Sequence, residues 1–178
     1  MKKQDIIILS VLLIALVLVR VIFNIPNFNP VGAIALMGGL LFGNKILAYL
    51  IPLGALFVGD ILMGLSSPMY MEYILSPSFL MVYGSFAAII TLGILLNRKP
   101  SLSKVLGGSI LAAVLFFLIT NAGAWATLPE YPKTLDGLAL SYKAGLPFFR
   151  STLVSQVVFS LGIYLVYSLS TNRKLALA

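Results

Sequence analysis

Five stretches of the chain approach the length that a helix needs to cross a bilayer, and each contains at most one charged residue: 6–23, 46–65, 79–96, 105–120 and 148–169. The hydrocarbon core of a membrane is about 30 Å thick and requires roughly 20 helical residues. Of the 178 residues, 60% are hydrophobic and only 10% are charged. The sequence therefore predicts an all-α integral membrane protein, with a single domain over residues 1–178 and no separate soluble catalytic domain.

A sixth apolar run, residues 30–43, is shorter than the others. It would cover only about 20 Å as a helix. Asn29 followed by Pro30 is typical of an N-cap and a first helical position. We expect a short or partly re-entrant helix here, which gives a bundle of six transmembrane helices.

The distribution of basic residues supports six crossings. With that count, eight of the twelve Lys and Arg residues fall on one side of the membrane: Lys2, Lys3, Lys45, Arg98, Lys99, Lys104, Arg173 and Lys174. Because cytoplasmic loops are rich in Lys and Arg, we expect both termini to lie in the cytoplasm of a bacterial cell, below its inner membrane. The first run continues past Arg20 without a small-residue cleavage site, so we expect a retained helix and not a signal peptide.

Two residue types are missing, and their absence excludes much chemistry. The chain has no Cys and no His, which excludes disulfides, thiol nucleophiles, imidazole bases and the metal sites that use these ligands. The net charge of +7 does not indicate a nucleic acid partner, because the basic residues are scattered between apolar runs. No phosphate-binding GxxxxGKS or GxxxxGKT motif occurs, and neither Ser109 nor Ser160 has a neighbouring base. We expect no enzyme activity, no cofactor and no metal.

The segment between the last two predicted spans, residues 121–147, is long and aromatic. A connection of more than about 15 residues is usually functional or disordered, and Trp125 and Tyr131 are too apolar to remain in water. Residues 134–144 show the spacing of a short amphipathic helix with one apolar face, formed by Leu135, Leu138, Ala139 and Tyr142. The segment either caps the outer mouth of the bundle or anchors at the membrane interface through its aromatic side chains.

Three ionisable residues lie inside predicted spans, all near the outer side: Arg20, Asp60 and Arg150. A central Arg or Asp costs about 2.5 to 3.5 kcal/mol, so such groups usually face the bundle interior and pair. One interpretation is a structural ion pair of Asp60 with Arg150 or with Arg20. In the other, two cations facing one carboxylate leave a positive charge for an anionic group of a ligand. Gln156 adds an amide at comparable depth.

The candidate substrate-binding residues lie on the outer side: Asp60, Asn121, Trp125, Tyr131 and Arg150. Small-molecule sites are mostly apolar, with a few fixed polar groups. We expect Arg150 and Asn121 to contact polar groups of the ligand, while Asp60 holds Arg150 in place. Trp125 and Tyr131 are expected to stack over the ligand.

Small residues share one helix face at Ala35, Gly39 and Gly43. Such faces allow close approach of a neighbouring helix. Two interpretations stay open: internal packing, and docking to a second membrane subunit.

Two stretches resemble a known group of proteins: "PNFNPVGAIALMGGLLFGNKILAYLIPLGALFVGDILMG" and "TNAGAWATLPEYPKTLDGLALSYKAGLPFFRSTL". Over nearly the whole chain, the sequence resembles an uncharacterised family of six-helix bacterial membrane proteins. That family is similar to the substrate-binding S components of energy-coupling factor (ECF) vitamin transporters. The resemblance implies an outward-facing substrate pocket closed by loops. It also implies a partnership with a transmembrane scaffold subunit and two ATPases, which would account for the missing phosphate-binding motif.

The sequence departs from the S-component pattern in the first helix. The alanine-rich docking motif expected there is missing, since "VLLIALVLV" contains only Ala15. The face at Ala35, Gly39 and Gly43 is the candidate substitute.

The sequence favours membrane transport, in which the protein binds a small vitamin-like or cofactor-precursor molecule from outside and carries it inward. Membrane lipid is the surrounding partner. One alternative is a non-transporting membrane scaffold similar to rod-shape determining proteins. Another is a membrane-embedded enzyme for lipid or prenyl substrates, which is disfavoured because the five acidic residues are spread far apart.

Overall fold

The computed structural model describes residues 3–23, 28–74, 76–96 and 100–171, and every regular element within these ranges is an α-helix. In chain order they are α1 (Lys3–Phe23), α2 (Val31–Leu41), α3 (Lys45–Ser66), α4 (Pro68–Ile74), α5 (Pro77–Leu96), α6 (Leu102–Thr127) and α7 (Leu135–Ser170). Five of these helices, α1, α3, α5, α6 and α7, are long and apolar enough to cross a membrane. This is the architecture of a multi-pass membrane protein.

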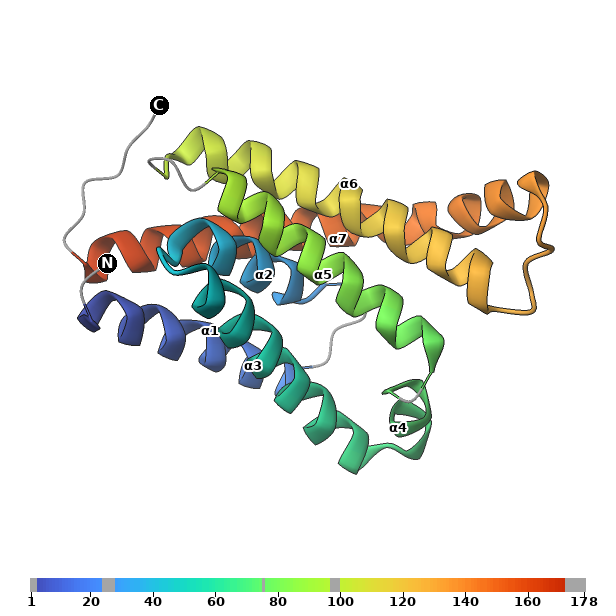
Figure 1. Ribbon diagram of the computed structural model, residues 1–178, viewed down its shortest axis with the longest axis horizontal. Helices are drawn as coiled ribbons and strands as arrows, with labels where there is room; N and C mark the ends of the chain where they lie inside the picture. Colours follow the sequence, from blue (N-terminus) through green and yellow to red (C-terminus); the bar gives the residue numbers. More distant parts are fainter. Residues whose placement is uncertain (1–2, 24–27, 75, 97–99, 172–178) are drawn as a thin grey trace.

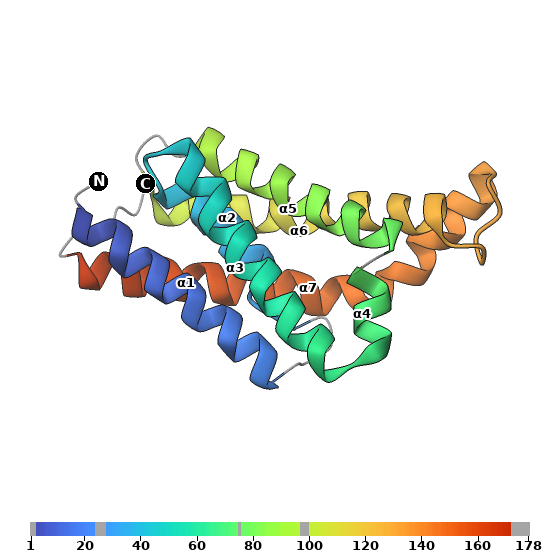
Figure 2. The ribbon, with the colours of Figure 1, turned by 60° about the horizontal axis from the view of Figure 1, so that its bottom comes forward.

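The long helices run roughly side by side, and their ends gather at two ends of the bundle. Figure 1 shows the start of α1 and the end of α7 at one end, together with the α2–α3 connection. Helix α4 lies toward the opposite end, where the α6–α7 hairpin extends beyond the other helices (Figures 1 and 2). For brevity we name these the terminal end and the hairpin end.

Helix α2 is the centre of the bundle. Ten of its 11 residues are buried, and it contacts α1, α3, α5, α6 and α7. At 1.5 Å per residue it is about 16 Å long, which is half the hydrocarbon thickness. Its N-terminus therefore lies inside the bundle, where polar groups are costly unless they are paired.

The small-residue face of α2 packs inside the protein. A Cβ on Gly39 would lie 2.2 Å from the carbonyl oxygen of Ile90, and one on Gly93 would lie 2.3 Å from that of Leu36. Ala35 has no exposed surface, and Gly43 lies beyond the end of the helix. Internal packing against α5 thus accounts for Ala35 and Gly39, which leaves no surface at these two residues for a partner subunit.

The outer surface is apolar, the reverse of a soluble protein. Val11 and Ile22 on α1 are 62% and 72% exposed, and Leu80 on α5 is 71% exposed. Scattered exposed apolar residues are normal, but here they follow the long helices, as expected where side chains face lipid.

The predicted long connection at 121–147 is wrong. Helix α6 continues to Thr127 and α7 begins at Leu135, so the predicted short amphipathic helix is the first part of α7. The two helices hold each other: the Tyr142 hydroxyl donates to the Leu118 carbonyl at 3.0 Å, and a Cβ on Gly145 would strike the amide of Asn121. This packing explains why α7 continues through Pro147, a residue that usually ends a helix.

Candidate functional site

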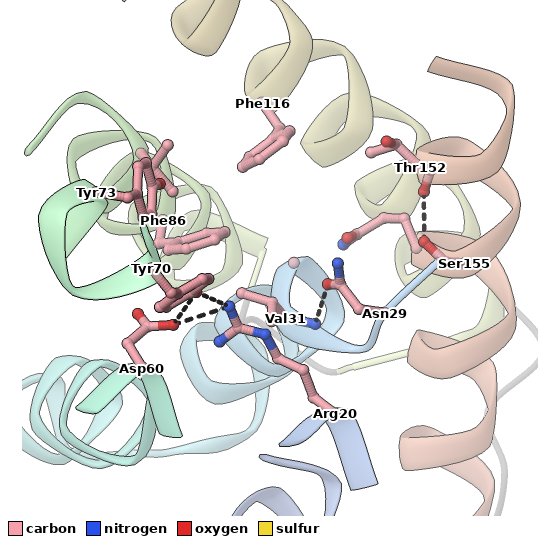
Figure 3. A pocket seen from close by; sticks show the side chains of 13 residues that line it. Arg20, Asn29, Val31, Asp60, Tyr70, Tyr73, Phe86, Phe116, Thr152 and Ser155 are labelled. Carbon is pink, nitrogen blue, oxygen red and sulfur yellow. Dashed lines mark hydrogen bonds and ion pairs between the residues drawn. The ribbon is translucent and has the colours of Figure 1, made fainter. Parts of the chain in front are cut away.

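A cavity of about 200 Å³ opens among the helix ends on the hairpin side of α2. Its walls come from every helix of the bundle (Figure 3). They are formed by Arg20, Asn29, Val31, Gly32, Asp60, Tyr70, Tyr73, Val82, Phe86, Phe116, Thr152, Ser155 and Gln156. The cavity is therefore the point at which the polar residues of several spans meet.

One wall holds a buried ion pair. Nη2 of Arg20, near the end of α1, lies 2.8 Å from Oδ1 of Asp60 in α3, and the two side chains are 15% and 4% exposed. The ion pair predicted for Asp60 is confirmed with Arg20, whereas the prediction that Asp60 holds Arg150 is wrong. Because both charges are withdrawn from water, each depends on the other for compensation.

Two tyrosines complete the hydrogen bonding of Asp60. The Tyr70 hydroxyl, from α4, donates to Oδ1 at 2.8 Å and accepts from Nη2 of Arg20 at 2.8 Å. The Tyr83 hydroxyl, from α5, donates to Oδ2 at 2.5 Å. The carboxylate thus receives donors from three elements, α1, α4 and α5. Figure 3 shows the contacts with Arg20 and Tyr70, of which the second fixes α4 against the bundle.

Burial also changes the acidity of the α4 tyrosines. Desolvation by burial raises the pKa of Tyr73 to about 12, and the nearby charge of Asp60 raises it further. The pKa of Tyr70 is raised as well, by burial first and then by its hydrogen bond to Asp60, against the lowering effect of Arg20. Both hydroxyls stay protonated at neutral pH, and that of Tyr70 donates to Asp60.

The opposite wall is uncharged and polar. Figure 3 shows Asn29, Thr152 and Ser155 across the cavity from Asp60 and Tyr70. The hydroxyls of Thr152 and Ser155 donate to carbonyls of their own helix, Phe148 and Thr152. Oδ1 of Asn29 accepts from the backbone N–H of Val31, the first residue of α2, at 3.1 Å. The N-cap of α2 is Pro30 and not Asn29 as predicted.

Gln156, on this wall, has a buried amide nitrogen, Nε2, without a hydrogen-bond partner among the described residues. The residue is 4% exposed. Gly32 makes room for it, since a Cβ there would lie 2.1 Å from its Oε1. A buried amide without a partner costs about 1 to 3 kcal/mol, so such a group calls for a specific reason.

Aromatic rings form the apolar part of the lining. Phe86 of α5 and Phe116 of α6 stack with their centroids 5.5 Å apart and an angle of 19° between the rings. Tyr73 lies on the same side of the cavity as Phe86 (Figure 3). The site thus combines flat apolar surfaces with a few fixed polar groups, as small-molecule sites usually do.

Four of the five predicted site residues lie elsewhere. Arg150 is exposed on α7, and its long side chain is free to reach the lipid headgroup region. Asn121 lines a separate cavity of about 150 Å³ between α6 and α7 and donates to the Phe117 carbonyl at 2.8 Å. Neither residue lines the cavity at Asp60.

Trp125 lies in the last turn of α6 and Tyr131 in the connection to α7, and neither lines the cavity. The indole Nε1 of Trp125 donates to the Pro132 carbonyl at 2.9 Å. Lys133 Nζ donates to the carbonyls of Trp125, Leu128 and Tyr131, which fastens the turn. Of the predicted site residues, only Asp60 lines the cavity.

Metal chemistry finds no support in the arrangement. Within the described residues, no group of three or more Asp, Glu, His or Cys residues lies close enough to hold a metal ion. The two carboxylate oxygens of Asp60 are occupied by Arg20, Tyr70 and Tyr83.

The sequence matches a family of unknown function, DUF6580, over residues 1–177. The chain belongs to the DUF6580 family. No curated protein and no solved structure matches it. The cavity described above is therefore the basis for reasoning about what this DUF6580 member does.

Sequence reasoning missed most of the aromatic lining. Tyr70 and Tyr73 fall in a segment between two spans that the sequence analysis left without a structure, yet their spacing of three residues places both on one face of a helix. Proline at position 68 after Ser67 is a recognisable start for such a helix. Nothing in the sequence marks Phe86 and Phe116 as residues of a site, because aromatic residues are common in apolar helices.

Proposed function

We propose that this protein is a membrane transport component that binds a small vitamin-like or cofactor-precursor molecule in the cavity at Arg20 and Asp60 and carries it inward. The resemblance to S components of ECF transporters motivates this proposal. The observation that carries it is the cavity itself, a polar and aromatic space inside an apolar bundle. Ionisable groups inside a membrane protein are expensive, and those that persist usually serve a substrate path.

The proposed orientation follows from the helices and the charges. We take α2 as a sixth, short crossing, so that the terminal end faces the cytoplasm of a bacterial inner membrane. Lys3, Lys45 and Lys104 all lie at helix starts on that end. The cavity then lies in the outer half, accessible from outside, with α4 as the segment that closes over it.

Energy for uptake would come from other proteins. The sequence contains no phosphate-binding motif for ATP hydrolysis. A transmembrane scaffold subunit with ATPases is the partnership that the resemblance implies. The non-transporting scaffold remains the alternative function, and a rigid scaffold has no need of a polar cavity.

Native mass spectrometry of the protein purified from its own host tests this function. We expect wild type to retain a small molecule. Val82, which lines the cavity, is replaced by tryptophan to fill it, and Val82→Trp is expected to lose the bound mass. Val154→Trp is the matched control, since Val154 is 46% exposed on α7.

Each result of this experiment has a defined meaning. Retention by wild type and Val154→Trp but not by Val82→Trp supports a binding site in the cavity. Equal retention by all three, or none by any, contradicts it. The same preparation shows whether scaffold and ATPase subunits accompany the protein.

A further inference from the structure

The walls of the cavity also limit the chemistry of its ligand. We propose that the ligand is an uncharged molecule of about one aromatic ring, bound through hydrogen-bond acceptor atoms on its edge to Gln156, Asn29 and Arg20. This inference rests on the proposed binding function and adds the substrate class to it. It follows from the charge of the lining, from its hydrogen-bond donors and from the size of the cavity.

The charge of the lining is balanced. Arg20 and Asp60 are its only residues with an ionised side chain at neutral pH among those described, and they are paired with each other at 2.8 Å. A charged ligand group would arrive in a buried site with no opposite charge left to compensate it. Burial of an uncompensated charge costs several kcal/mol, so a neutral ligand is favoured.

The free hydrogen-bonding capacity is mostly donor capacity. Within the described part of the chain, Nε2 of Gln156 has no hydrogen-bond partner. The oxygen of Asn29 is occupied by the Val31 N–H, which leaves its amide nitrogen as the group that offers hydrogens. Only Nη2 of Arg20 takes part in the contacts with Asp60 and Tyr70, and a guanidinium has donors on all three nitrogens.

Besides the hydroxyl of Tyr73 and Oε1 of Gln156, each of which can accept a hydrogen bond, the walls offer few acceptors. The Asp60 carboxylate already receives three donors. The hydroxyls of Thr152 and Ser155 donate to carbonyls of their own helix, so each offers a ligand only its oxygen, as an acceptor. A ligand with carbonyl oxygens or ring nitrogens, and at most one or two N–H groups beside them, therefore matches the site.

Size and shape complete the description. A cavity of about 150 Å³ is known to hold benzene, so a cavity of about 200 Å³ holds one ring with a small substituent. The stacked rings of Phe86 and Phe116 offer flat surface nearby. Aromatic pairs add about 0.5 to 1.5 kcal/mol beyond their area burial, so a flat ring is favoured over an aliphatic chain.

The test uses four probes with the same ring and different edge groups: benzamide, benzoate, benzylammonium and toluene. They represent a neutral acceptor, an anion, a cation and an apolar edge. Binding is titrated by ligand-observed NMR on the full chain in lipid nanodiscs, and the signal from Val82→Trp nanodiscs is subtracted to remove membrane partitioning. We expect the affinity for benzamide to be at least about tenfold higher than that for each of the other three probes.

A second measurement asks whether Gln156 makes the contact. Gln156→Met keeps the length of the side chain and removes its hydrogen-bond donors. We expect it to lower the affinity for benzamide about tenfold. Its thermal unfolding temperature should stay at or above that of wild type, because the lost Nε2 makes no hydrogen bond to any residue that the structure describes. Gln4→Met, at an exposed position of α1, is the matched control and should bind as wild type does.

Gly32→Ala provides an independent route to the same contact. The new Cβ would displace the amide of Gln156, so benzamide binding should fall although residue 156 is unchanged. Unchanged binding in both Gln156→Met and Gly32→Ala would overturn the assignment of this donor.

The outcomes separate this inference from the function on which it rests. If benzoate or benzylammonium binds most tightly in a way that Val82→Trp abolishes, the neutral class is wrong and the cavity remains a binding site. If no probe shows binding that depends on the cavity, the ring class is overturned. The retained mass in the native experiment then decides the binding function by itself.

Discussion

Arg20 and Asp60 meet at 2.8 Å inside the bundle. They belong to different helices, and each is the one charged residue of its apolar run, 6–23 or 46–65. Tyr70 hydrogen-bonds to both of them. This cluster joins α1, α3 and α4 at the cavity, so the same contacts that stabilise the fold also shape the candidate site.

Removal of one partner should destabilise the protein strongly. Arg20→Met leaves a buried carboxylate with only hydroxyl donors, and breaking a buried pair costs about 3 to 5 kcal/mol. We expect a clear drop in the thermal unfolding temperature in detergent. The double variant Arg20→Met, Asp60→Leu should recover most of it, because no uncompensated charge remains.

Arg150→Met is the control for this pair. Its side chain is exposed, so the change should alter stability by about 0.5 kcal/mol or less. An equal loss in Arg20→Met and Arg150→Met would contradict the assignment of Arg20 as the partner of Asp60.

Alkaline pH should weaken the fold through α4. The pKa of Tyr73 is raised to about 12 by burial, against about 10 for an unfolded tyrosine. Its contribution to stability is therefore complete below about pH 10 and is lost as the pH rises toward 12. The fall in unfolding temperature between about pH 9 and pH 11.5 should be smaller in Tyr73→Phe, and an unchanged fall would count against this coupling.

The contact between α2 and α5 should not tolerate side chains. In Gly39→Ala and Gly93→Ala the new Cβ would overlap backbone atoms of the facing helix, and overpacking usually costs about 1 to 3 kcal/mol. Gly107→Ala and Gly162→Ala are matched controls, since nothing lies within 4 Å of the Cβ built there. In thermal unfolding, these control variants should be as stable as wild type or more stable by up to about 1 kcal/mol.

Lys133 should hold the α6–α7 turn in shape. Its Nζ donates to Leu128 and Tyr131 carbonyls at 2.7 and 3.1 Å and also to the Trp125 carbonyl. In Lys133→Met we expect amide hydrogen exchange across residues 125–137 to become several-fold faster. Lys143→Met, exposed on α7, should leave exchange in that segment unchanged.

The long helices could be predicted because bilayer thickness sets the length of an apolar run. The five long helices and the short α2 all appear, with starts within a few residues for α1, α2, α3, α5 and α6. The hairpin was mispredicted because Thr120 and Asn121 look like a loop, and Pro147 looks like a break. Contacts between α6 and α7 override these local preferences, and such contacts are not visible in a local pattern.

The site was predictable only in part, for a related reason. The cost of burying Asp60 shows that it must have a partner, but the choice between Arg20 and Arg150 depends on how helices pack. Gln156 was recognised as a polar group at the right depth. That its Nε2 has no hydrogen-bond partner among the described residues depends on how Gly32 of α2 packs beside it. Tyr70 and Tyr83 needed the fold, since they reach Asp60 from α4 and α5.

Uptake by intact cells tests the central claim most directly. The compound that co-purifies with the protein is supplied in labelled form to host cells that express wild type, Val82→Trp or Val154→Trp at equal levels. The account predicts that label accumulates with wild type and Val154→Trp and falls to the level of cells without the protein in Val82→Trp. Equal accumulation in all three strains, or none above background, would contradict it.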